Sequence, residues 1–266
     1  MTAPRGGRWG DLQTRVISAV VMVAVGAVDI WLGGTPFSAL VVCLTGLMFW
    51  ELALMTAPGI PQTAIAIGGI AALSLAATLF VPWHSRTALL LVPLLGLWVT
   101  PRRIPWITVG YGAAILVAVY GLISLRDGAG TPAILWLIGV VIASDILGYF
   151  AGRLLGGPKF LPAISPKKTW SGTVAGWVGA ALVGLGFVLF GGAGWGLLVL
   201  SPLVAFAGQM GDIAESWIKR RTGVKDSSHL IPGHGGVLDR FDALIGAVVA
   251  VMALGLIIPL PLPTGN

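Results

Sequence analysis

The sequence has little charge and only one cysteine. Of its 266 residues, 10% are charged and 56% are hydrophobic, whereas soluble domains carry roughly 25% charged residues. The mean hydropathy is +0.94. This composition excludes an ordinary soluble domain and predicts an integral membrane protein. The single cysteine, Cys43, excludes an intrachain disulfide.

Two nucleotide and acyl-transfer motifs are also missing. No G-x-x-x-x-G-K-[ST] stretch occurs, so the sequence gives no support to a P-loop nucleotide site. No G-x-S-x-G stretch occurs either, which argues against the nucleophile elbow of serine hydrolases. Any chemistry must therefore come from another arrangement of polar residues.

Long apolar runs dominate what remains. A membrane-spanning helix needs about 20 mostly apolar residues, and continuous runs favour helices over the alternating strands of a barrel. We therefore predict an all-α polytopic membrane protein with about nine transmembrane helices. The expected spans are 16–32, 36–56, 61–82, 86–100, 106–125, 131–151, 171–190, 194–215 and 240–260.

The distribution of basic residues predicts the orientation. With the amino terminus in the cytoplasm, including Arg5, Arg8 and Arg15, nine crossings leave only Arg86 and Arg126 on the outer side. Cytoplasmic loops of membrane proteins carry the excess of Lys and Arg. The pattern predicts that the basic loops face the cytoplasm. We expect an integral protein of a prokaryotic inner (cell) membrane, with any active site in these loops facing the cytoplasm.

Acidic residues divide the chain into two regions. The four acids of residues 1–140 are scattered without a shared spacing, whereas the six from Asp145 onward lie at predicted membrane ends or in basic loops. We expect an amino-terminal transmembrane region, 1–140, and a carboxyl-terminal catalytic region, 141–266. The catalytic region has two predicted cytoplasmic loops, 152–170 and 216–239. Gly172 and Gly176 fall four apart and predict close helix packing.

Carboxylates in the second region could hold a divalent cation. Asp212, Glu215, Ser216 and Lys219 recur at three- and four-residue intervals, so they form one stripe on a helix. A carboxylate at the membrane edge is a functional hypothesis by default, although an interhelical salt bridge explains it too. Mg²⁺ prefers such oxygen ligands. His229 and His234 raise zinc as a rival, but the chain supplies few further nitrogen or sulfur donors.

The basic loop 152–170 ends where a predicted span begins. Ser165, Lys167, Lys168 and Thr169 supply donors there, after Pro166. Helix amino termini attract phosphate, but lysines beside a span are also ordinary membrane anchors. From these residues alone both interpretations stay open. The same holds for His234, which could contact phosphate or be a satisfied loop histidine.

Two blocks resemble a known family. The run SWIKRRTGVKDSSHLIPGHGGVLDRFD fills every fixed position of the pattern S-x-x-K-R, K-D and P-G-H-G-G-x-x-D-R-x-D. This pattern is similar to the signature of the phosphatidate cytidylyltransferases, or CDP-diacylglycerol synthases. The stretch Ser165 to Gly172 resembles the second block of that family, S-P-K-K-T-x-E-G, except that Ser171 replaces the glutamate. The resemblance covers Asp145 to Asp242.

The resemblance implies transfer of the cytidylyl group of CTP to phosphatidate by metal-assisted direct displacement, in phospholipid biosynthesis. It implies Mg²⁺ as cofactor, with a second metal or a monovalent ion left open. The expected partners are CTP, phosphatidate and membrane lipid; a homodimer is a candidate assembly, and no nucleic acid is expected.

Together, charge placement and resemblance predict the site residues. The expected metal ligands are Asp212 and Asp239, followed by Asp242 and Asp145. The expected catalytic residues are Asp212, Asp239, Lys219, Lys225, Arg240 and His234. The expected substrate-binding residues are Ser165, Pro166, Lys167, Lys168, Thr169, Ser216, Arg220, Asp226, Gly233, Gly235 and Gly236.

Two alternatives use the same residues differently. A related CTP-dependent enzyme could act on an archaeal ether lipid or a polyprenol. A transporter would explain Asp29, Glu51 and Asp145 as intramembrane acids. However, the charged residues gather in loops rather than at the midplane, where transporters usually place their sites.

Overall fold

The computed structural model describes residues 8–264. Arg5 of the predicted basic head and the outermost residues of the two predicted regions lie outside this range. Each of the nine predicted apolar segments forms a helix within the described chain. These helices are α1 (Arg8–Leu32), α2 (Gly34–Thr56), α3 (Pro61–Thr78), α4 (Trp83–Val99), α5 (Pro105–Gly128), α6 (Thr131–Leu154), α7 (Trp170–Phe190), α8 (Leu197–Thr222) and α9 (Leu238–Gly255).

Seven of the described helices are long and apolar enough to cross a membrane. Outside this group are α4, which is a short apolar helix, and α9, which begins with a charged turn. The polytopic helical architecture is confirmed, whereas the count of nine crossings stays a prediction. Many large apolar side chains point outward, among them Val23 on α1 and Leu182 on α7. Such exposure suits a surface that lipid covers.

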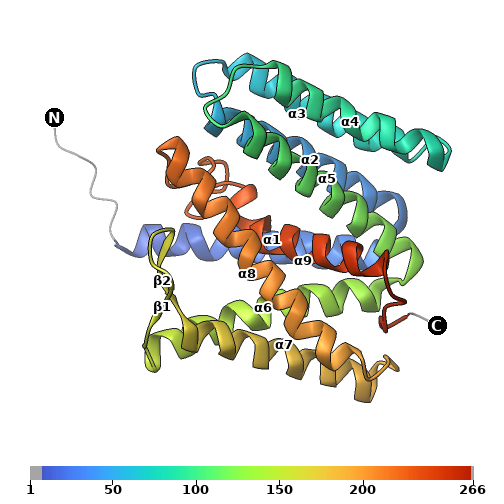
Figure 1. Ribbon diagram of the computed structural model, residues 1–266, viewed down its shortest axis with the longest axis vertical. Coiled ribbons are helices and arrows are strands. Elements are labelled where there is room, and N and C mark those ends of the chain that lie inside the picture. Colours follow the sequence, from blue (N-terminus) through green and yellow to red (C-terminus); the bar gives the residue numbers. More distant parts are fainter. Residues whose placement is uncertain (1–7, 265–266) are drawn as a thin grey trace.

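The loop 152–170 contains a structure that its sequence did not suggest. Strands β1 (Lys159–Leu161) and β2 (Ser165–Thr169) pair antiparallel as a short hairpin between α6 and α7. The hairpin lies at the same end of the bundle as the amino terminus of α1 (Figure 1). Its two strands bring Lys167 and Lys168 back over the start of α7.

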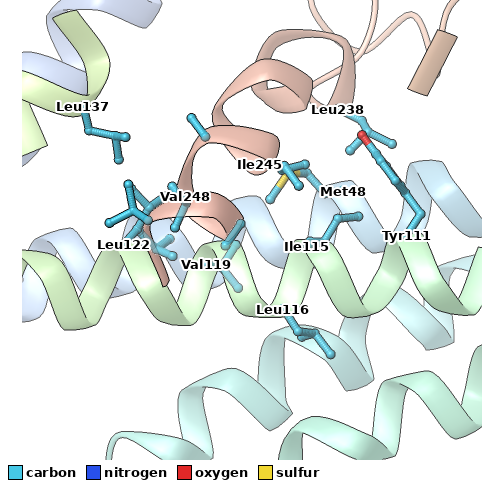
Figure 2. Packing of buried hydrophobic residues seen from close by; sticks show 14 of the residues in the cluster. Met48, Tyr111, Ile115, Leu116, Val119, Leu122, Leu137, Leu238, Ile245 and Val248 are labelled. Atoms are coloured by element: carbon cyan, nitrogen blue, oxygen red, sulfur yellow. The ribbon is translucent and has the colours of Figure 1, made fainter. Parts of the chain in front are cut away.

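Helix α9 is the central element of the bundle. It packs against α8, its neighbour in sequence, and against α5 and α2 from the first half of the chain. Figure 2 shows Ile245 and Val248 of α9 above a row of α5 residues that includes Val119 and Leu122. Helix α9, whose first turns carry Asp239 and Asp242, is therefore packed against helices from both halves of the chain.

Glycines permit the closest helix contact. A Cβ added to Gly172 would lie 2.5 Å from the carbonyl oxygen of Gly148 on α6. A Cβ on Gly176 would lie 2.7 Å from the hydroxyl of Ser144 on the same helix. The close packing predicted for this glycine pair is confirmed. This contact joins α6 and α7 next to the hairpin lysines and Asp145.

Candidate active site

A pocket of about 530 Å³ opens between the ends of α6, α7, α8 and α9 and the β-hairpin. Its volume lies within the range of roughly 300–1,000 Å³ that is typical of ligand sites. Its wall combines acids, bases and small residues. The lining residues are Ser144, Asp145, Gly148, Tyr149, Gly152, Arg153, Lys167, Lys168, Thr169, Gly172, Thr173, Gln209, Asp212, Asp239, Arg240, Asp242 and Ala243.

Eight of the predicted site residues line this pocket. They are Asp145, Lys167, Lys168, Thr169, Asp212, Asp239, Arg240 and Asp242. They come from α6, the hairpin, α8 and α9, so the fold brings both sequence blocks to one place. In particular, Asp212 and Asp239 share the pocket despite their positions on different helices.

The β-hairpin places its lysines against α8. The ammonium of Lys168 lies 2.5 Å from a carboxylate oxygen of Asp212 and donates a hydrogen bond to the backbone carbonyl of Gln209. Thr169 ends the strand and caps α7, because its hydroxyl accepts a hydrogen bond from the amide of Gly172. This cap satisfies one of the free amides at a helix start. The extended strand and the cap together set the direction of Lys168.

The polar stripe predicted on α8 is present. Ser216 donates a hydrogen bond to Asp212, and Lys219 forms an ion pair with Glu215, each one turn away on the helix. Glu215 is completely buried, and its Oε1 atom has no hydrogen-bond partner. Glu215 is paired with Lys219 on its own helix and also interacts with the Asp242 carboxyl on α9, so it links the stripe to the wall of the pocket.

Lys219 joins α8 to α9. Its ammonium lies 2.8 Å from Glu215 and 2.6 Å from Asp239. The second oxygen of Asp239 accepts hydrogen bonds from the hydroxyl and amide of Ser227 and from the amide of Gly236. Burial opposes ionisation of Asp239, but the hydrogen bonds from Lys219, Gly236 and Ser227 hold its pKa below the ordinary value of 3.8. Asp239 is thus a fixed anion at the first turn of α9.

Electrostatic repulsion links the remaining acids. Asp242 interacts with both Asp212 and Glu215, and Asp145 interacts with Asp212. Lys168 partly offsets the charge around Asp145. Several carboxylates gathered around one pocket form a setting that suits a bound cation.

The glycine turn of the signature lies beside the pocket rather than in its wall. Gly233 and Gly235 have φ values of 75° and 85°, in the left-handed region that favours glycine. The amide of Gly236 already donates to Asp239. The carbonyl of His234 accepts a hydrogen bond from Arg240, while the Nδ1 atom of His234 is buried without a partner. The turn thus supports the charged start of α9.

The other predicted residues do not line the described pocket. They are Ser165, Pro166, Ser216, Lys219, Arg220, Lys225, Asp226, Gly233, His234, Gly235 and Gly236. Ser216 contacts Asp212 and Lys219 contacts Asp239, although neither Ser216 nor Lys219 itself lines the pocket. Roles of the whole set in substrate binding stay predictions.

Ser171, which departs from the resembled pattern, has a local role. Its hydroxyl donates a hydrogen bond to the carbonyl of Gly156 and is bonded to the hydroxyl of Thr169. It therefore ties the end of α6 to the start of α7. A neutral serine satisfies these contacts without adding charge to the lysines of the hairpin.

Three polar residues near the pocket were not among the predicted site residues. The amide of Gln209 bonds to Trp177, Ser144 and the carbonyl of Thr173, and so joins α6, α7 and α8 at the pocket. Glu51 on α2 accepts a hydrogen bond from the hydroxyl of Ser227, in the loop that precedes α9, and this hydroxyl also lies within hydrogen-bond distance of Asp239. An acid inside an apolar span was the only available signal for Glu51, and its partners could not be read from spacing.

Comparisons with known proteins agree with the signature. A sequence model of the Cytidylyltransferase family matches residues 13–258. The chain is 37% identical over 268 residues to the phosphatidate cytidylyltransferase of Brucella abortus biovar 1, covering 94% of this chain and 96% of that protein. It is 40% identical over 140 residues to the phosphatidate cytidylyltransferase of Helicobacter pylori, covering 52% of each chain. The match to the whole sequence extends the resemblance into the first half.

Proposed function

The chain belongs to the cytidylyltransferase family, and we propose that it transfers the cytidylyl group of CTP to phosphatidate, forming CDP-diacylglycerol and pyrophosphate. The family match confirms the membership that the signature predicted. Relatives named phosphatidate cytidylyltransferase occur in several bacteria. The observation that carries the proposal is the single pocket in which Lys167, Lys168 and Arg240 lie beside four carboxylates at the end of apolar helices.

The pocket suits two anionic substrates. An anionic phosphate oxygen of phosphatidate attacks the α-phosphorus of CTP, and the bond from that phosphorus to the bridging oxygen of the β-phosphate breaks. Pyrophosphate leaves with the bond electrons. No activated serine or cysteine is needed, because the attacking oxygen is already anionic. The difficulty is to hold two anions in line while negative charge grows on the leaving group.

The donor set fits Mg²⁺. No three His, Cys, Asp or Glu side chains form a preformed metal cluster among residues 8–264. Mg²⁺ is usually held by one or two carboxylates together with water and substrate phosphates, so an incomplete protein cage agrees with it. Asp212 and Asp239 would hold the ion first, with Asp242 and Asp145 as further ligands. A bound Mg²⁺ supplies charge neutralisation of the phosphates.

The basic residues take the complementary role. Lys167 and Lys168 reach the pocket from the hairpin, and Arg240 reaches it from α9. They orient the phosphates of CTP and of the lipid and offset their mutual repulsion. Lys219 acts from behind by holding Asp239 in place. This division gives a positioning role to Lys219, which the sequence analysis placed among the expected catalytic residues.

The lipid acyl chains remain in the bilayer. The pocket lies at the end of the helices that carries the hairpin, and exposed apolar side chains such as Tyr149, Phe150 and Leu154 follow α6 beside it. A headgroup could then enter the pocket while its acyl chains stay against the helix. Under the predicted orientation this end faces the cytoplasm, where CTP is available.

Purified protein in mixed micelles tests the proposal. Labelled CTP, phosphatidate and Mg²⁺ should give CDP-diacylglycerol and one pyrophosphate for each lipid formed, and chelation with EDTA should stop the reaction. A polyprenol and an archaeal ether lipid in place of phosphatidate serve as competing acceptors. Equal or faster transfer to either of them would overturn the assigned acceptor, and the absence of transfer to any of the three would overturn the assigned reaction.

A further inference from the structure

Glu51 is the clearest buried group that the proposed reaction does not use. It lies on α2, in the half of the chain that contributes no residue to the pocket wall. Its side chain is 0% exposed. A buried carboxylate is costly unless hydrogen bonds compensate it, so its partners indicate what the residue does.

Four donors bind the Glu51 carboxylate, and all belong to the signature loop, defined here as residues 223–238. The hydroxyl of Ser228 and the amide of Val237 donate to Oε1, at 2.5 and 2.9 Å. The hydroxyl of Ser227 and the amide of Leu238 donate to Oε2, at 3.2 and 2.6 Å. One side chain therefore holds two separate parts of the loop, residues 227–228 and residues 237–238.

The two amides belong to the start of α9. Val237 is the residue before that helix, and no side chain of the loop itself caps it. Glu51 thus supplies from α2 the acceptor that a helix normally finds next to its own first turn. A carboxylate at this position also opposes the positive end of the helix dipole.

Ser227 connects this cap to Asp239. Its hydroxyl lies 3.2 Å from Glu51 and 2.9 Å from Asp239, and its amide also donates to Asp239. The space around these groups is full, because a Cβ on Gly236 would lie 2.0 Å from the Ser227 hydroxyl and 2.5 Å from Glu51. The contact is therefore specific, and Glu51 cannot shift without moving the groups that hold Asp239.

We infer that Glu51 is a positioning residue of the active site, which fixes the first turn of α9 and, through Ser227, the carboxylate of Asp239. The inference rests on the proposed function for its catalytic consequence. It assigns the first half of the chain a part in the reaction geometry that the pocket wall does not reveal. Groups that orient a ligating side chain typically change metal affinity or activity by about 10–100-fold when removed.

Substitution of Glu51 by Gln gives a sharp test, because each carboxylate oxygen accepts one backbone amide as well as one serine hydroxyl. A hydroxyl can rotate to accept a hydrogen bond, but a backbone amide can only donate. Whichever way the Gln amide is turned, its NH₂ group faces a backbone N–H. Glu51→Gln therefore loses one cap that a carboxylate alone can make.

The expected result is a fall in kcat of about 10–100-fold, with a higher Mg²⁺ concentration at half-maximal rate and little change in KM for phosphatidate. Hydrogen exchange at the amides of Val237 and Leu238 should become faster. Thr45→Val is the matched control, since Thr45 is equally buried on α2 and its hydroxyl bonds only to the carbonyl of Val41. It should leave rate, Mg²⁺ dependence and exchange unchanged. Glu51→Asp keeps both oxygens and should recover part of the kcat.

Each outcome decides a separate point. An active wild type with an equally active Glu51→Gln variant would overturn the inference and leave the proposed function intact. A wild type without cytidylyl transfer would overturn the proposed function, while the exchange data would still decide whether Glu51 holds α9. If Glu51→Gln fails to fold, Ser227→Ala provides the second variant: it keeps both helix amides on Glu51 and should still raise the Mg²⁺ requirement. Unchanged Mg²⁺ dependence in Ser227→Ala would contradict the proposed link to Asp239.

Discussion

The ammonium of Lys168, on the β-hairpin, lies 2.5 Å from the carboxylate of Asp212, on α8. This ion pair joins the hairpin to the helix that leads into the signature run, and both side chains line the same pocket. Lys168, which is proposed to bind substrate phosphate, therefore lies directly beside Asp212, a proposed metal ligand. The charge arrangement of the pocket therefore depends on the hairpin as much as on the helices.

Substitution of Lys168 by Gln should raise KM for CTP and lower kcat/KM by roughly 10–100-fold, the range expected when a charge-assisted hydrogen bond is lost. The reason is that both the phosphate contact and the partner of Asp212 disappear. Initial rates over a range of CTP concentrations measure the effect. Lys159→Gln on the exposed face of β1 is the control and should retain wild-type kinetics. Equal losses in the two variants would point to general disruption of the hairpin.

Replacement of Asp239 by Asn should reduce Mg²⁺-dependent formation of CDP-diacylglycerol by at least about 100-fold, a scale typical of losing one electrostatic group in a reaction site. The change removes the anion that Lys219, Ser227 and Gly236 hold in place. Asp127→Asn, an exposed position at the end of α5, is the matched control. Undiminished turnover in Asp239→Asn would remove Asp239 from the proposed metal ligands.

Addition of one methyl group at Gly172 should destabilise the protein. In Gly172→Ala the new Cβ would meet the carbonyl oxygen of Gly148, a backbone atom that has little freedom to retreat. We expect a loss of about 1–3 kcal/mol in the free energy of unfolding, as for other overpacked sites. Thermal unfolding in detergent measures it. Gly186→Ala lies on the same helix in open space and should be close to neutral. A similar melting temperature for both variants would contradict the close contact of α6 and α7.

Cysteine labelling can test the predicted orientation. In a Cys43→Ala background, Lys159→Cys should resist a membrane-impermeant maleimide in intact cells and react after lysis. Asp127→Cys, near the opposite ends of the helices, should react in intact cells. The basis is the excess of basic residues in the loops at the hairpin end. The reverse labelling pattern would invert the topology without affecting the assignment of the pocket residues.

The helices could be predicted because each is a long apolar run, and hydropathy depends only on local sequence. The hairpin could not, since β2 contains Pro166 and two lysines, which local propensity assigns to a loop. Its pairing becomes favourable only when the ends of α6 and α7 are already close. The stripe from Asp212 to Lys219 was accessible because it follows helical spacing.

The organisation of the site was only partly accessible from sequence. The charge pattern and the family resemblance pointed to Asp212 and Asp239, and the pocket contains both. The engagement of Lys219 with two carboxylates depends on how α8 crosses α9, which no spacing rule fixes. Glu51 is the clearest case, because the packing of α2 beside α9 is a tertiary event and the acid has no patterned neighbours.

The contact of Glu51 with the start of α9 limits how this protein can be divided. A fragment that begins after residue 140 would contain every signature residue, yet the amides of Val237 and Leu238 would have lost their acceptor. A chimaera that takes the signature run from a relative would lose the same contact unless α2 were exchanged together with the run. Engineering of a minimal catalyst from this scaffold therefore has to begin with a pair of distant segments rather than with the motif.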